Sequence, residues 1–159
     1  MKCAPFLLLC ALAAFGCRPA TTGPGRVFYL QLVRGNNDQT PPTPAAKPIG
    51  PKLDQRLRSF CKWNRYWEIR RDSIVARPSQ CVRKHLSPGQ DVEIELLDSR
   101  RMAVRVYQSG TLTRSRNQPS DGAFFITGGK EGADQSWFIV VRQDPPLDPG
   151  PHWPLQKVE

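Results

Sequence analysis

The chain has 159 residues, of which 39% are hydrophobic and 23% are charged, with 16 prolines, 12 glycines, 5 cysteines and a formal net charge of +9. This length allows one domain of ordinary size and excludes large multidomain enzymes. The hydrophobic fraction is close to that of folded proteins, so it excludes disorder along the whole chain. We therefore expect one folded domain joined to proline-rich segments.

The first residues form a basic and then apolar segment that predicts export. Met1 and Lys2 give the basic start, and residues 4–16 are almost entirely apolar. The apolar run is too short to cross a hydrocarbon core, which needs about 20 residues, but it has the shape of a secretory signal peptide. We predict a signal peptide at residues 1–16 and a periplasmic, envelope-anchored or extracellular location.

Processing at Cys17 has two alternatives. The run Ala14-Phe15-Gly16-Cys17 resembles the lipobox of bacterial lipoproteins, where a leucine-alanine-glycine-cysteine pattern precedes a lipidated cysteine. This resemblance implies that Cys17 is the lipidation site and that a lipid anchor holds the protein at a membrane. The small residues at positions 14 and 16 also fit ordinary cleavage and free secretion. Residues 17–25 contain prolines, threonines and glycines, which indicates an extended linker.

The body of the chain, residues 26–143, is predicted to form a single β-rich domain. The β-branched and aromatic run at residues 27–33 indicates the first strand. Residues 36–51 are proline-rich and lack apolar periodicity, so we expect a long loop and place the preceding strand at a sheet edge. Leu53, Leu57 and Phe60 have helical spacing, which predicts one short helix of about three turns.

From Trp63 onward the apolar residues recur with a period of two, which is typical of strands. The predicted strands are residues 66–70, 73–76, 81–86, 91–97, 102–107, 111–113, 123–127 and 137–141. Turn residues separate most of them, at Arg77-Pro78-Ser79, Ser87-Pro88-Gly89, Ser109-Gly110 and Gly128-Gly129. This pattern predicts a mainly β fold, an antiparallel sandwich or a small barrel, with a proline-rich C-terminal tail at residues 144–159.

Two strand arrangements follow from the side-chain pattern. Alternating apolar residues at 92–96 and 102–106 share one face only if Leu96 lies opposite Met102, and this register places Glu93 opposite Arg105. The run 137–141 is apolar on both faces, which predicts a central strand or one covered on both sides.

Cys61 and Cys81 are the cysteines that remain in the body once the signal segment and Cys17 are set aside. An even pair in an exported chain favours a disulfide, because oxidising compartments preserve such bonds. The alternative is two buried free thiols. Adding His85 as a metal ligand leaves the site without a fourth ligand, so no metal is predicted.

The excess of basic over acidic residues is the strongest compositional signal for binding. Arginines interleave with aromatic residues near the start of the β-rich region, and guanidinium groups bind phosphate and carboxylate groups well. The candidate binding residues are Arg65, Arg70 and Arg71, with Trp63 and Trp67 as stacking surfaces. The alternative is a solvated charged sheet with these aromatic residues in the core. Export argues against a nucleic acid and favours an envelope protein or an anionic or glycan polymer.

No catalytic or cofactor motif is complete. The run 128–132 lacks phosphate-loop spacing and indicates a hairpin loop, and the two histidines, His85 and His152, have no catalytic setting in the sequence. We therefore predict no cofactor and a non-catalytic exported β domain that binds a partner protein or an anionic or glycan envelope surface. The alternatives are a structural or assembly accessory of an envelope complex and, less favoured, an enzyme.

Overall fold

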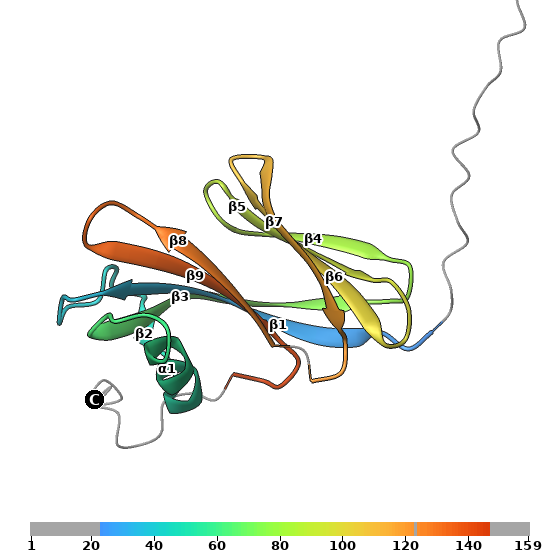
Figure 1. The fold of residues 1–159 in the computed structure, drawn as a ribbon, viewed down its shortest axis with the longest axis horizontal. Coiled ribbons are helices and arrows are strands. Elements are labelled where there is room, and N and C mark those ends of the chain that lie inside the picture. Colours follow the sequence, from blue (N-terminus) through green and yellow to red (C-terminus); the bar gives the residue numbers. More distant parts are fainter. Residues whose placement is uncertain (1–22, 123, 147–159) are drawn as a thin grey trace, which may run out of the picture.

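The computed structural model describes residues 23–122 and 124–146, which form a two-sheet antiparallel β-sandwich with one short helix (Figure 1). The strand order is β2-β3-β1-β9-β8 in the first sheet, sheet A, and β4-β5-β6-β7 in the second, sheet B. The predicted mainly β fold is confirmed. Among the described residues no strand ladder closes the two sheets into a barrel, so the architecture is the sandwich.

Sheet A is formed by β2 (Lys47–Pro48), β3 (Arg65–Ala76), β1 (Arg26–Asn36), β9 (Gln135–Arg142) and β8 (Phe124–Lys130). Sheet B is formed by β4 (Cys81–Ser87), β5 (Gln90–Leu96), β6 (Arg101–Gln108) and β7 (Thr111–Pro119). The helix, α1, spans Pro51–Arg58.

The main core lies between the two sheets and follows from the alternation of apolar residues. In sheet B, the apolar residues of β5 and β6 point inward with the register expected from the sequence: Leu96 lies opposite Met102, Ile94 opposite Val104 and Val92 opposite Val106. On the outer face Glu93 lies opposite Arg105, and the guanidinium is 2.8 Å from the carboxylate. The predicted hairpin register is confirmed.

A second apolar layer covers the outer face of sheet A. Leu53 and Leu57 of α1 pack with Val33, Phe138 and Val140. Strand β9 therefore buries side chains on both faces and lies between β1 and β8, as its sequence predicted.

The helix begins at Pro51, where a proline costs no helical hydrogen bond because the first helical N–H groups have no partner in the helix. It ends at Arg58 and is shorter than predicted. Phe60 is 56% exposed, so its helical spacing does not reflect burial. The Arg58 guanidinium bonds Asp54 one turn earlier and the carbonyl oxygen of Asn64 after the helix, and these bonds hold the chain as it turns back toward β3.

Two sequence predictions about sheet A are wrong. Strand β1 is central, not an edge strand, because β9 returns from the end of the domain to pair with it. Gly128 and Gly129 are in β8 and not in a turn, because the aromatic rings of β9 fill the space that their missing side chains leave. The predicted loop at residues 36–51 also contains β2, which pairs with β3.

Several predictions fall on residues that the structure does not describe. These are the signal peptide at residues 1–16, lipidation at Cys17, most of the linker at 17–25 and most of the tail at 144–159. Within the described residues, no helix is long and apolar enough to cross a membrane.

We expect Gly128→Ala to destabilise the fold. A Cβ atom at this position would lie 2.6 Å from the carbonyl oxygen of Trp137 and 2.7 Å from a ring carbon of Phe138, so β8 or β9 must shift. Overpacking of this kind lowers the free energy of unfolding by about 1–3 kcal/mol, measurable by urea denaturation. Ser115→Ala on the exposed strand β7 is the control, with an expected change within about 0.5 kcal/mol. Equal stability of the two variants would contradict the tight β8–β9 contact.

Candidate functional site

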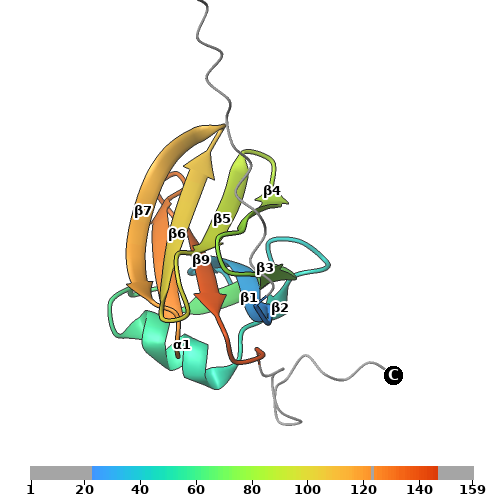
Figure 2. The same ribbon diagram turned by 90° about the vertical axis from the view of Figure 1, so that its right-hand side faces the viewer.

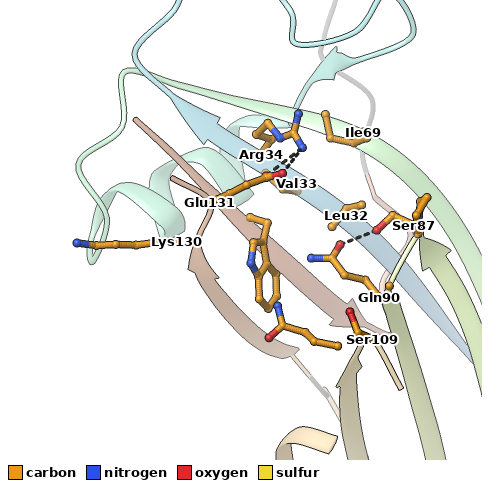
Figure 3. A pocket seen from close by; sticks show the side chains of 13 residues that line it. Leu32, Val33, Arg34, Ile69, Ser87, Gln90, Ser109, Lys130 and Glu131 are labelled. Carbon is orange, nitrogen blue, oxygen red and sulfur yellow. Dashed lines mark hydrogen bonds and ion pairs between the residues drawn. The ribbon is translucent and has the colours of Figure 1, made fainter. Parts of the chain in front are cut away.

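One end of the sandwich is open and forms a cavity of about 470 Å³ between the two sheets (Figure 3). Sheet A contributes residues from β1, β3, β8 and β9. Sheet B contributes its two turns, at residues 87–90 and 108–109. The lining residues are Leu32, Val33, Arg34, Ile69, Ser87, Pro88, Gly89, Gln90, Gln108, Ser109, Lys130, Glu131 and Trp137.

A β-bulge in sheet A shapes one wall of the cavity. Leu32 pairs with Arg70, but the next residue of β1, Val33, pairs with Glu68, so Ile69 is an extra residue in β3. A bulge bends its strand and increases the local twist. Ile69 packs against the main core and also lines the cavity. Because of the bulge, the apolar wall that sheet A forms extends beyond the ends of the sheet B strands.

Trp137 forms the aromatic part of the wall and is 8% exposed. It lies opposite Gly129 of β8, where a Cβ atom would come within 2.9 Å of the indole ring. The glycine thus allows the indole to lie directly on the β8 backbone. This packing fixes the ring from one side and leaves its remaining exposed surface at the cavity.

The rim of the cavity is polar. On the side of sheet A, Arg34 forms an ion pair with Glu131, at 2.9 Å between the guanidinium and the carboxylate. On the opposite side the Ser87 hydroxyl donates a hydrogen bond of 2.7 Å to the Gln90 side-chain carbonyl (Figure 3). Gln90 consequently has its amide N–H groups available to a ligand.

The two sheet B turns that border the cavity are held together. The Ser109 N–H donates a 2.7 Å hydrogen bond to the Gly89 carbonyl oxygen. Both residues have positive φ angles, 48° at Ser109 and 79° at Gly89, which glycine adopts freely and other residues adopt mainly in tight turns. This bond joins the two turns, so Ser109 and Gln90 both border the cavity from neighbouring turns.

The predicted arginine and aromatic residues do not form one surface. Trp67 is 3% exposed, and its indole N–H donates to the Asn36 side-chain oxygen, so this ring is in the core and is not a stacking surface. Trp63 is half-buried against Gly35, on the face of sheet A that α1 covers. Arg65 is exposed at the start of β3.

Arg70 and Arg71, in contrast, line a second pocket of about 340 Å³ together with Lys47. Arg70 is 3.5 Å from Asp72, and Arg71 is 2.9 Å from Glu68, which also lines the pocket. Ile69 of the bulge lines both this pocket and the cavity, so the two are adjacent. Two of the candidate arginines from the sequence, Arg70 and Arg71, thus line a pocket, and the sequence contained no sign of the cavity beside it.

The predicted disulfide is absent, because Cys61 and Cys81 are free thiols in different layers. Cys61 packs in the layer under α1, while Cys81 begins β4 on the outer face of sheet B, beside Glu93. Burial raises the pKa of both thiols. For Cys81, burial and then the Glu93 carboxylate raise the pKa to about 11.

Several other titratable groups form structural ion pairs, among them the groups around Asp91. His85 and Arg83 both contact Asp91 on the outer face of sheet B, and their hydrogen bonds lower the pKa of that carboxyl group. In the described part of the chain, no three His, Cys, Asp or Glu side chains gather closely enough to hold a metal ion. His152 lies outside the described residues.

Comparison with known proteins found no matching family model, no similar curated protein and no similar solved structure.

We expect the Cys81 thiol to react slowly with iodoacetamide at pH 8 despite its exposure. Raising the pKa from 9.0 to about 11 lowers the reactive thiolate fraction about a hundredfold. Peptide mass mapping should show slow alkylation of Cys81 in the folded chain and fast alkylation in urea. Glu93→Gln should accelerate the folded-state reaction, since it removes the neighbouring negative charge. A Cys61–Cys81 bond in the unreduced protein would contradict the free thiols.

Proposed function

We propose that the protein is an exported, non-catalytic β-sandwich domain that binds an anionic glycan of the cell envelope. The open-end cavity holds a saccharide unit, and the adjacent basic pocket holds acidic groups along the same polymer. The observation that supports this proposal best is the composition of the cavity: an indole and aliphatic wall, a polar rim of amides and hydroxyls, and a guanidinium at the entrance.

The cavity chemistry suits a sugar ring. A pyranose has an apolar C–H face that packs against an indole or aliphatic wall, here Trp137, Leu32 and Ile69. Its hydroxyl groups accept from and donate to the side chains of Gln90, Gln108 and Ser109.

Acidic groups on the sugar have cationic partners. Arg34 lies at the cavity entrance, and Lys47 and Arg70 line the pocket next to it. A guanidinium binds a carboxylate through two parallel hydrogen bonds, which gives it both strength and orientation. A linear uronic acid polymer can therefore contact the cavity and the basic pocket together.

The lining residues favour binding over cleavage. Glu131 is the single carboxylate among them, and its partner is Arg34. Glycoside hydrolysis generally needs two carboxyl groups placed about 5–10 Å apart across the bond. The thirteen lining residues also include no histidine or cysteine that could act as a base or nucleophile.

We expect Arg34→Gln to weaken binding of an oligosaccharide of uronic acid units about tenfold, since one charge-assisted pair is lost. A neutral oligosaccharide of the same length should bind the variant and the original chain equally. Calorimetric titration at low and high salt measures both, and salt should weaken only the acidic ligand. Arg100→Gln, on the exposed β5–β6 turn, is the control. Equal binding of the acidic ligand by all three chains would refute the site.

Export is tested separately by the intact mass of the protein from its native cells. We expect the mature chain to lack residues 1–16. A mass that begins at Cys17 with added acyl chains would establish the lipid-anchored form, and an unacylated mass would establish free secretion. Retention of the first sixteen residues would contradict export.

A further inference from the structure

Strand β8 has an edge that is open to pairing with another chain. Free strand edges usually have a bulge, a proline or charged residues that block such pairing. Strands β3, β4 and β7 each have a register break against their inner neighbour, and β7 also has Arg114, Arg116 and a terminal proline. In β8 (Phe124–Lys130) the only charge is on the last residue, Lys130, the strand contains no proline, and its register with β9 is unbroken. Among the described edge strands, β8 is therefore the least protected against such pairing.

The backbone of β8 is also accessible near its end. Gly128 and Gly129 have no side chains, and the rings of Phe138 and Trp137 occupy the space on either face of the strand. These two residues therefore have no side chain that could block an extended segment beside the strand. An edge strand directs every second N–H and C=O pair outward, where an added strand can bond them.

The neighbouring strand of sheet B has an uncovered inner face. Arg114 lies opposite Val106 and Arg116 opposite Val104, and directly opposed residues share a face of the sheet. Both valines are fully buried in the core, yet both arginines are exposed. Sheet A ends at β8 and sheet B ends at β7, the outermost strand at the left of Figure 2. The exposure of both arginines indicates that sheet A does not cover this part of β7.

Arginines lie on β7, the strand that precedes β8 in the chain, and over the first residue of β8. On the side of sheet B, Arg114 bonds the carbonyl oxygen of Thr113, and neither Arg114 nor Arg116 has an acidic partner among the described residues. On the side of α1, the Arg56 guanidinium lies 4.1 Å above the ring of Phe124, the first residue of β8. A strand added here would direct alternate side chains toward these two groups of cations.

We infer that the β8 edge binds an extended acidic segment of a partner protein by strand addition, independently of the proposed saccharide site. Acidic side chains on one face of the segment pair with Arg114 and Arg116, and apolar side chains on the other face pack beside Phe124, under Arg56. The main chain continues sheet A and covers the inner face of β7. A second copy of this chain fits less well, because its β8 edge brings the same arginines and no acidic residue.

The test uses the full chain and a seven-residue peptide of alternating glutamate and valine, with binding measured by fluorescence anisotropy at low salt. The double variant R114E/R116E should bind the peptide at least about tenfold more weakly and should gain affinity for the lysine-valine counterpart. The control R77E/R100E has the same net charge but changes two exposed arginines that lie outside the strands. It should keep the affinity of the original chain to within about twofold.

Backbone pairing is tested with two N-methylated peptides, in which methyl groups block alternate amides on one edge or on the other. Strand addition predicts that one peptide loses binding and the other retains it. Bound peptide should also slow amide hydrogen exchange in β8 and leave exchange in β4 unchanged.

Three results would overturn the inference: equal binding of both methylated peptides, unchanged affinity of R114E/R116E, or peptide-independent dimers in light scattering that protect the β8 amides. The first would mean attraction by charge alone, and the third would assign the edge to a second copy.

Discussion

The fold depends on the burial of sheet A on both of its faces. Strands β1 and β9 direct apolar side chains to both sides, so the sheet needs two apolar covers. Sheet B supplies one, and α1 with the end of the proline-rich segment supplies the other. Sheet B does not extend over the whole inner face of sheet A. The open-end cavity exists because part of that apolar inner face is bordered by the two turns of sheet B instead of by strands.

Features that depend on neighbouring residues could be predicted from the sequence. Alternation fixed the face of every residue in the β5–β6 hairpin, and the apolar run of β9 indicated cover on both sides. Predictions failed where the structure of a segment depends on a residue that is distant in the sequence. Gly128-Gly129 has the composition of a turn, but in the fold these glycines accommodate the Phe138 and Trp137 rings. The cysteine pair suggested a bond, but the strand order places the two thiols in different layers.

The candidate site was even less predictable from the sequence than the fold was. Its residues come from positions as far apart as Leu32 and Trp137, and each is unremarkable in its own segment. Both turns at the rim were recognisable from Ser87-Pro88-Gly89 and Ser109-Gly110, but nothing local indicated that they meet. Ile69 faces the cavity because of a bulge, and a bulge depends on the register between two strands. The arginines of the basic pocket were predictable because charge does not depend on register.

The distribution of charge explains why the cationic surfaces are few. Nearly every carboxylate in the described residues is already in an ion pair, as are Glu93 with Arg105 and Asp121 with Arg26. The excess positive charge therefore lies on groups without such partners. Most of these are scattered over exposed turns, where water and salt screen them. At the basic pocket, cations line a partly enclosed space, where screening is weaker and acidic groups are attracted more strongly. On the inner face of β7, Arg114 and Arg116 are two residues apart on one face of the strand, so their charges act together. These two places, and not the cations scattered over the exposed turns, are therefore the ones that we propose as sites for acidic ligands.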